Sequence, residues 1–193
     1  MTATLTRPAL PPALTEGLDD PLPVTEAAPA TEGAVKTKEL VIVSESGDLE
    51  RTWATTILAS TAAAGEMKVS IFFTFWGLFS LVRPEVRVTG TNWMQKMLAM
   101  MNRPGIDHAR LSKLNFAGMG PWMMKKLARQ YGVAEPRELL EMAQALGVRL
   151  IPCQMSMDMM GISPDQLIDG VEPAVGAAAA LELMTNADAS LFI

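Results

Sequence analysis

The sequence predicts a three-layer α/β domain built on an open, mostly parallel sheet with helices on both faces. Two short runs, "LVIV" at 40–43 and "VSIFF" at 69–73, are apolar at nearly every position. This pattern is typical of central strands that are buried on both faces, because helices cover both sides of a parallel sheet. Segments with helical character follow these runs, and glycines end most of them. At 193 residues and 49% hydrophobic composition, the chain can bury one sizeable core.

The first half of the expected sheet can be placed residue by residue. The strand at 40–43 ends in small polar residues, after which Asp48 is expected to cap a helix. That helix runs to Gly65, where a left-handed glycine would end it. A second buried strand follows within 67–78 and is expected to stop at Gly77.

In the second half of the chain, helices and strands are also expected to alternate. We expect helices at both ends of 91–132, separated by the glycine-rich loop 103–120. A helix at 135–147 precedes a third strand at 148–152, and its apolar face is expected to carry Leu139, Met142, Ala143 and Leu146. The remaining expected elements are a capped turn at 163–170 with Ser163 and Gln166 as its capping box, a short strand near 171–175, a helix at 176–184 and a final strand at 189–193.

The N-terminal segment differs in composition from the rest of the chain. It holds six of the 13 prolines, and residues 1–35 carry five acidic residues against Arg7 alone, a net charge of −4. Such a segment buries too little apolar surface to order itself. We therefore expect a disordered acidic tail at 1–36 and an α/β domain at 37–193. The remaining chain has a net charge near −1, which argues against a nucleic-acid partner.

Cysteine and histidine usage limits the chemistry further. With one cysteine and one histidine, the chain has no internal disulfide and no ordinary zinc site, and we expect no metal or organic cofactor. The N-terminus lacks the apolar core of a secretory signal, and the longest uncharged apolar run, 69–82, is too short to span a membrane. These features predict a cytoplasmic protein in which the thiol stays reduced.

In open α/β sheets, function lies at the carboxyl ends of the strands. Three loops are expected there: 44–48, 75–77 and 152–154. Pro152 favours an extended Ile151, and "QMSMDMM" before Gly161 favours a short helix. Cys153 is therefore expected at a strand-to-helix turn, where free amide groups stabilise a thiolate and lower its pKa. The alternative is a small buried hydrophobe, the usual role of a lone cysteine.

A single thiolate at this turn suits only some reactions. A dithiol oxidoreductase needs a second cysteine, and Ser156 of C-x-x-S cannot replace it. Acyl transfer would need a base, and His108, in a distant loop, is the only imidazole. Sulfane-sulfur transfer needs neither. It requires a thiolate of low pKa that is accessible to a donor, and a pocket that shields the resulting persulfide.

Three segments resemble the DsrE/DsrF-like family, in particular its soluble DsrE-type branch. They are "CQMSMDMMGI" with the following "DQLIDGVEPA", "SIFFTFWGL", and the closing "LELMTNADASLFI". The resemblance covers roughly 38–193. It implies a flavodoxin-like three-layer fold, oligomers, and sulfur relay with rhodanese, TusA-type carriers or a heterodisulfide-reductase-like complex. By this resemblance Cys153 is the persulfide-bearing residue of a sulfur carrier or sulfurtransferase. Some relatives carry a membrane-spanning hairpin, for which this chain lacks long enough segments.

The pocket around the thiol is expected to draw on all three loops. Its candidate residues are Ser44, Ser46, Gly47, Phe75, Trp76, Gly77, Gln154, Met155 and Ser156. Phe73 and Phe75 fit the core face of the second strand, whereas Trp76 lies beyond its end and could cover a persulfide. Trp93 begins an apolar stripe with Met94, Met97, Leu98 and Met101, which is either core or a subunit interface of a homo-oligomer.

Three other interpretations remain open. Cys153 and the following methionines suggest Cu(I) ligation, although a helix would direct Met155 and Met159 away from Met157. "SESGD" at 44–48 suggests a phosphate loop, although it matches no phosphate-binding motif and Glu45 and Asp48 would repel phosphate. The third is a non-catalytic oligomeric scaffold for other sulfur-metabolism proteins.

Overall fold

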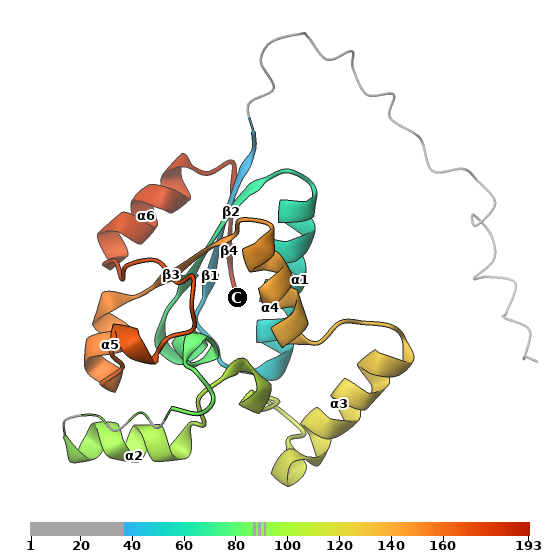
Figure 1. The fold of residues 1–193 in the computed structure, drawn as a ribbon, viewed down its shortest axis with the longest axis vertical. Helices are drawn as coiled ribbons and strands as arrows, with labels where there is room; N and C mark the ends of the chain where they lie inside the picture. The colour runs from blue at the N-terminus through green and yellow to red at the C-terminus, as the bar shows by residue number, and fades with distance from the viewer. Residues whose placement is uncertain (1–36, 87, 89, 91) are drawn as a thin grey trace, which may run out of the picture. The chain divides into compact units, whose positions relative to one another are not determined.

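The computed structural model describes residues 37–86, 88, 90 and 92–193, so the tail predicted at 1–36 lies outside the described residues. Four parallel strands form one sheet in the order β3-β2-β1-β4 (Figure 1). They are β1 (Glu39–Ser44), β2 (Lys68–Phe73), β3 (Arg149–Pro152) and β4 (Ala189–Phe192). The predicted fold class, an α/β domain with helices on both sides of a parallel sheet, is confirmed.

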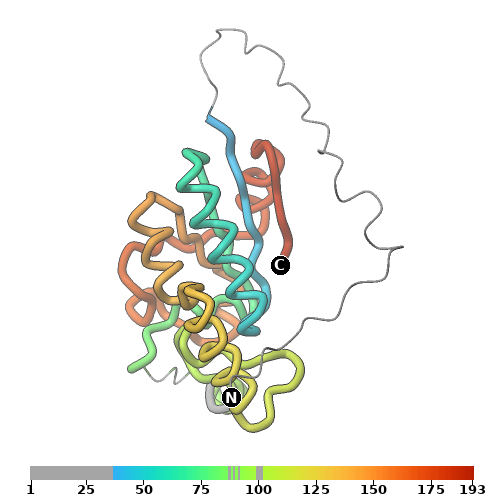
Figure 2. The backbone as a smooth tube through the Cα atoms, turned by 90° about the vertical axis from the view of Figure 1, so that its right-hand side faces the viewer, coloured from blue at the N-terminus to red at the C-terminus, as the bar shows by residue number. Residues whose placement is uncertain are grey.

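Helices pack on the two faces of this sheet. Helices α1 (Leu49–Ala64) and α4 (Pro136–Ala145) lie together on one face, and α6 (Ala177–Asn186) lies on the other (Figures 1 and 2). The larger core cluster joins Leu40, Ile42 and Ile71 of the strands to Ala59 of α1 and to Leu140 and Ala143 of α4. The two central strands are therefore apolar on both faces because each face is covered.

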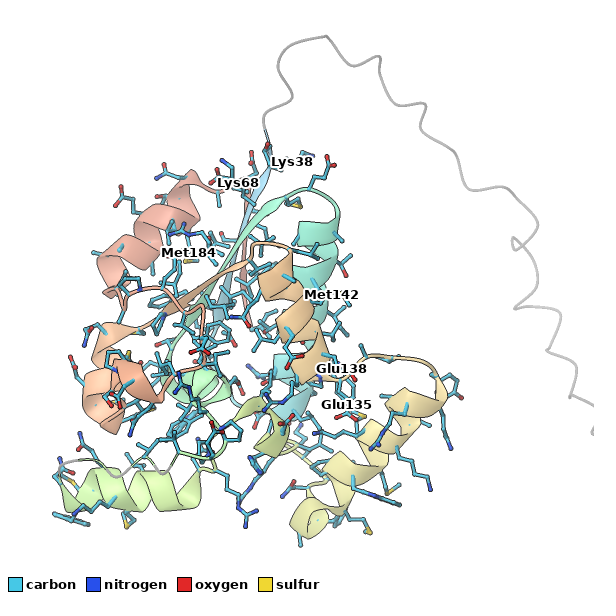
Figure 3. The ribbon with its side chains drawn as sticks, viewed as in Figure 1. Lys38, Lys68, Glu135, Glu138, Met142 and Met184 are labelled. Atoms are coloured by element: carbon cyan, nitrogen blue, oxygen red, sulfur yellow. The ribbon has the colours of Figure 1, made fainter. Side chains whose placement is uncertain are left out.

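A smaller cluster occupies the opposite face of the sheet. It consists of Val43, Phe72, Ile151, Cys153 and Ala180, with Val175, Leu183 and Met184 packed against it. Met184 lies on α6, the helix that covers this face (Figure 3). The cysteine therefore belongs to the thinner of the two core layers.

Two helix-end predictions have different outcomes. Gly65 follows α1 as expected, but its φ is −85°, so the left-handed conformation predicted there is wrong; the next residue, Glu66, has φ of +63° instead. The capping box predicted at Ser163 and Gln166 is present, and it starts a single 3₁₀ turn (Pro164–Gln166).

On α4, the predicted apolar face is only half buried. Leu139 and Ala143 are buried together with Leu140, whereas Met142 and Leu146 are exposed (Figure 3 labels Met142). The helix is turned so that Leu140, not Met142, faces the sheet. Its first turn closes with a reciprocal capping box between Glu135 and Glu138, both labelled in Figure 3.

The second strand is shorter than predicted. It ends at Phe73 and does not continue to Gly77, because a 3₁₀ segment, η2 (Phe75–Leu81), begins at Phe75. Phe75 has φ of +44° and is 40% exposed, so the prediction that it lies on the core face of the strand is wrong. Phe73 is buried as predicted. The strand expected near 171–175 is reduced to isolated bridges at Val171 and Val175.

The middle of the chain extends beyond the carboxyl ends of the strands (Figure 1). It contains α2 (Trp93–Met101), short 3₁₀ turns at Ile106–His108 and Phe116–Gly118, and α3 (Met119–Gln130). Another helix, α5 (Gln154–Met160), follows β3 directly. Among the described residues, no helix is both long enough and apolar enough to cross a membrane.

Candidate thiol site

The carboxyl ends of the three neighbouring strands are level. Ser44 pairs with Phe73, and Phe73 pairs with Pro152, so one row of residues closes β1, β2 and β3 together. The next residues are joined by backbone hydrogen bonds: the N–H of Thr74 donates to the Ser44 carbonyl at 3.0 Å, and the N–H of Cys153 donates to the Phe73 carbonyl at 2.9 Å. The three loops predicted at the carboxyl ends therefore meet at one edge.

Cys153 occupies the turn that the sequence predicts. It is the N-cap residue of α5, with extended φ and ψ, and its carbonyl accepts the N–H of Met157 at 3.0 Å. The next amide, of Gln154, is used by the Val175 carbonyl. The amides of Met155 and Ser156 remain in the first turn of α5, beside the cysteine, where they lower the pKa of its thiol.

Two opposing effects set the pKa of this thiol. Burial raises the pKa of Cys153, because it disfavours the charged thiolate. Hydrogen bonds from the hydroxyl and N–H of Ser156, the hydroxyl of Thr74 and the N–H of Met155 lower it. The hydrogen bonds prevail, so the pKa of Cys153 lies below its ordinary value. The thiolate is therefore stabilised by local donors at the first turn of α5.

Ser156 is the centre of this donor network. Its side chain is fully buried, and its oxygen accepts the N–H of Phe75 at 3.0 Å and lies 3.0 Å from the hydroxyl of Thr74. The Thr74 and Ser156 hydroxyls hydrogen-bond to each other, so the Ser156 proton is available to the sulfur when Thr74 is the donor of that bond. Ser156 thus connects the thiol to the turn that follows β2.

The thiol is shielded from solvent. Cys153 is 3% exposed, whereas sulfur transfer as expected from the sequence requires an accessible nucleophile. In this conformation that expectation is wrong, because Val175 and Ala180 pack over the thinner face of the sheet beside Cys153. Gln154 and Met155 of the predicted pocket are exposed, on the outer side of the same turn.

Two glycines allow the turns after β1 and β2 to approach closely. A Cβ on Gly77 would overlap the carbonyl oxygen of Ser44, and one on Gly47 would lie 2.8 Å from the carbonyl oxygen of Trp76. The N–H of Gly77 also donates to the Glu45 carbonyl at 2.8 Å. No side chain larger than hydrogen fits at either glycine without displacing backbone, so the two turns are in direct backbone contact.

Part of the predicted pocket faces a different space. Ser46, Gly47 and Trp76 line a cavity of about 290 Å³ that Cys153 does not reach. The loop 103–110 forms the opposite wall and brings Arg103, His108 and Arg110 to the same cavity. The predicted residues therefore fall into two groups: Ser44, Gly77 and Ser156 lie at or next to the buried thiol network, and Ser46, Gly47 and Trp76 lie on the cavity.

Comparison with known proteins agrees with this fold. Residues 36–192 match the model of the DsrE/DsrF/DrsH-like family. This chain belongs to the DsrE/DsrF/DrsH-like family. It is 40% identical over 158 residues to the uncharacterized protein YrkE of Bacillus subtilis, covering 82% of this chain and 98% of YrkE. It is 37% identical over 157 residues to the sulfur carrier protein DsrE2 of Allochromatium vinosum, covering 81% of this chain and 98% of that protein.

A solved structure shows the same fold at low sequence identity. The crystal structure of the E. coli YchN protein superposes with a TM-score of 0.51 at 19% identity, covering 81% of this chain and all of YchN. At that identity the likeness concerns the fold alone. The family assignment expected from the three sequence segments is confirmed.

In this DsrE/DsrF/DrsH-like chain, the methionines near the thiol do not gather around it. Met157 and Met160 are buried in the larger core cluster, whereas Met155 and Met159 are exposed. Cys153 lies in the smaller cluster. A Cu(I) site would need thioethers beside the thiolate, and this arrangement gives no support for one.

Sequence reasoning missed three polar residues of this region. Thr74 lies one residue before the predicted loop 75–77, and its position directly after a buried strand was the signal that could have identified it. Arg103 and Arg110 lie in an irregular loop, where no periodic pattern indicates the direction of a side chain. His108 is exposed and lines the cavity, so it does not lie at the thiol as a base.

Proposed function

We propose that this protein is a sulfur carrier that holds sulfane sulfur as a persulfide on Cys153. The observation that carries the proposal is the donor network around the thiol, formed by Ser156, Thr74 and the first amides of α5, which lowers the pKa of Cys153. Membership of the DsrE/DsrF/DrsH-like family and the similarity to a relative named as a sulfur carrier support a role in sulfur relay.

The proposed loading step needs no additional redox partner. The Cys153 thiolate attacks the terminal sulfur of a donor persulfide, R–S–SH. A new S–S bond forms on Cys153 while the donor's S–S bond breaks, and R–S⁻ leaves with the electron pair. Cys153 then carries S–SH, with the proton on the transferred sulfur. Transfer to an acceptor thiolate repeats the exchange in the opposite sense, and the same step describes a carrier or a sulfurtransferase enzyme.

Burial of the thiol has two consequences for this function. A persulfide on Cys153 would be protected from water and from other thiols, as a carrier requires. Loading would require the turn at Phe75 or the segment around Val175 to move, since both adjoin the site. Phe75 holds φ of +44°, a strained value for a residue with a side chain, which favours this turn as the part that moves.

We further propose that the protein acts as a homo-oligomer with relay partners, for which rhodanese, TusA-type carriers and a heterodisulfide-reductase-like complex are the candidates. The support is the exposed apolar surface of α2 and α3, where Trp93 is 70% exposed and Trp122 is 57% exposed, together with Met94, Met97, Met123 and Leu127. Trp93, Met94 and Met97 are therefore not core, which supports the interface interpretation. A cytoplasmic location is part of the proposal, because the thiol must stay reduced.

Intact-mass spectrometry tests the central claim. After incubation with polysulfide, or with thiosulfate and a rhodanese, the wild type should gain about 32 Da, the mass of one sulfur atom, for each sulfur transferred. The Cys153→Ser variant should gain no mass. Equal gain in both proteins would refute the assignment. Subsequent incubation with a reduced TusA-type acceptor should move the added mass to the acceptor.

The low exposure of Cys153 favours one second candidate, a non-catalytic scaffold for sulfur-metabolism proteins. A scaffold would bind its partners through the exposed surface of α2 and α3 and would not use the thiol. Pull-down with the relay partners together with measurement of sulfur flux separates the two functions. Retained binding and unchanged flux in Cys153→Ser would favour the scaffold, whereas retained binding with lost flux favours the carrier.

A further inference from the structure

The cavity beside Trp76 has an unusual distribution of charge. Arg103 and Arg110 both line it, and neither makes an ion pair in the part of the chain that the structure describes. The acidic residue of the same loop, Asp107, is bound by Arg137 and so does not neutralise them. One carboxylate, of Asp48, also lines the cavity, which leaves an excess of positive charge there.

His108 adds a directed polar group to the same wall. Its Nδ1 lies 2.8 Å from the Pro104 carbonyl, and because a carbonyl can only accept, Nδ1 carries the proton. In the neutral ring Nε2 is therefore the unprotonated nitrogen, and in the charged ring it is a second donor. His108 thus completes a wall with two guanidinium groups and one imidazole.

The loop that carries these groups is held in place by the rest of the fold. The Gly105 N–H donates to the Phe79 carbonyl at 3.0 Å, the Arg110 carbonyl accepts the Leu49 N–H at 2.8 Å, and Ile106 is buried. The two arginines therefore start from backbone positions that the fold holds, on the same wall of the cavity. Such an arrangement suits a preformed binding site better than a solvated surface loop.

A second cavity continues the first. It measures about 380 Å³ and shares Arg103, His108 and Arg110 with the cavity of about 290 Å³. Asn115 lines it, and the buried side-chain oxygen of this residue has no hydrogen-bond partner among the described residues. Asp48 is an acceptor and the Asn115 amide can also donate, so the combined site suits a ligand that has N–H donors for Asp48 as well as an anionic group.

We propose that this pair of cavities binds an anionic low-molecular-mass thiol or persulfide of the amino-acid or small-peptide type. Its carboxylate would engage the guanidinium groups of Arg103 and Arg110, which match a carboxylate in a two-point hydrogen bond. Its N–H groups would face Asp48, and its apolar thiol arm would lie along Phe79 and Trp76.

The position of the site relates this ligand to the thiol. Trp76 lines the cavity, and the N–H of the preceding residue, Phe75, is bonded to Ser156 in the first turn of α5, whose N-cap is Cys153. The ligand would therefore lie across one turn from the sulfur. The choice of a thiol or persulfide among anionic ligands rests on the proposed function, whereas the carboxylate and N–H requirements rest on the cavity alone.

Calorimetric titration with S-methylglutathione tests the binding claim without thiol exchange. The ligand should bind the wild type and the Cys153→Ser variant with equal affinity. The Arg103→Gln/Arg110→Gln variant should bind about tenfold more weakly or worse, since each charge-assisted hydrogen bond contributes on the order of a tenfold factor. Lys38→Gln/Lys68→Gln removes the same charge at the opposite ends of the strands, where Figure 3 labels both lysines, and should leave affinity unchanged.

Sulfate and thiosulfate serve as competing ligands in the same titration. Because they lack N–H donors, they should bind more weakly than S-methylglutathione. If they bind equally well or better with the same dependence on the two arginines, the site is a general oxyanion site and the proposed ligand class is wrong. Equal affinity of all four proteins for S-methylglutathione, or no binding to any, also overturns the proposal.

The two proposals can fail separately. If S-methylglutathione binds as expected but Cys153 gains no sulfur from any donor, the sulfur-carrier function fails while the cavity assignment stands. If Cys153 loads from a rhodanese but S-methylglutathione does not bind, the cavity assignment fails and the carrier function stands. Circular dichroism of each variant confirms that a loss of binding does not come from unfolding.

Discussion

The hydroxyl oxygens of Thr74 and Ser156 lie 3.0 Å apart, and both side chains lower the pKa of Cys153. One residue comes from the end of β2 and the other from α5, 82 positions apart in sequence. Stabilisation of the thiolate therefore depends on the tertiary fold as well as on the strand-to-helix turn. This relationship leads to the first two predictions.

Replacing Ser156 by alanine should raise the pKa of Cys153 by about 1–2 units. The variant loses a hydrogen bond to a charged group, which contributes about 1.5–3 kcal/mol, and one pKa unit corresponds to about 1.4 kcal/mol. The measurement is the pH dependence of the rate of alkylation by iodoacetamide. Ser163→Ala, which removes a hydroxyl from a distant capping box, is the control and should keep the wild-type profile. An unchanged pKa in Ser156→Ala would contradict the assigned role.

The lowered pKa also predicts that stability depends on pH. The folded protein loses the Cys153 proton at a lower pH than the unfolded chain does, whose thiol titrates near 8.5. The stabilisation that the ionised thiol contributes is complete above about pH 8.5. It is lost as the pH falls through the pKa of Cys153 in the folded protein. The free energy of unfolding of the wild type, relative to Cys153→Ser, should therefore be larger at about pH 9.5 than at about pH 6. Urea denaturation of both proteins measures this difference, and a difference that is constant with pH would show that the thiolate is not stabilised.

Gly77→Ala should destabilise the protein by about 1–3 kcal/mol or more, because the new Cβ overlaps the Ser44 carbonyl and neither group is at the end of a flexible side chain. Gly65→Ala is the matched control. Its φ is −85° and its nearest neighbour, the Ala62 carbonyl oxygen, would lie 3.4 Å from the new Cβ, so stability should change by less than about 1 kcal/mol. Chemical denaturation measures both, and equal stability of the two variants would mean that the turns can separate without cost.

Met157→Ala should cost about 2–5 kcal/mol in the free energy of unfolding, since the side chain is fully buried in the larger core cluster. Met155→Ala, two residues earlier and exposed, should change stability by less than about 0.5 kcal/mol. Urea denaturation of the pair measures the contrast. If both variants lost stability equally, the orientation of α5 and the division of its methionines would be wrong.

The parallel sheet was predictable because its signal is local. β1 and β2 each have four apolar residues of six, mostly consecutive, a pattern typical of strands covered on both faces. The position of Cys153 was also predictable, since Pro152 before it and Gly161 after α5 fix both sides of the turn. The end of β2 at Phe73, four residues before Gly77, was not predictable. It results from the left-handed conformation of Phe75, which nothing in the side chain of Phe75 favours.

The features that depend on distant contacts could not be inferred. Burial of the thiol results from packing of α6 and Val175 on the same face of the sheet, more than twenty residues beyond Cys153. The approach of Arg103 to the cavity results from the anchoring of an irregular loop by Phe79 and Ile106. Neither relationship has a periodic sequence signal, because it is set by which surfaces meet after the elements have formed.

The close approach of Gly77 to Ser44 has a consequence for attempts to change donor preference by directed evolution. Libraries that randomise the turn after β1 and the turn after β2 independently would consist mostly of proteins that cannot close this edge of the sheet. Productive diversity should instead be introduced at the exposed side chains of the 103–110 loop, leaving the two glycine contacts intact, or in both turns jointly with compensating backbone changes.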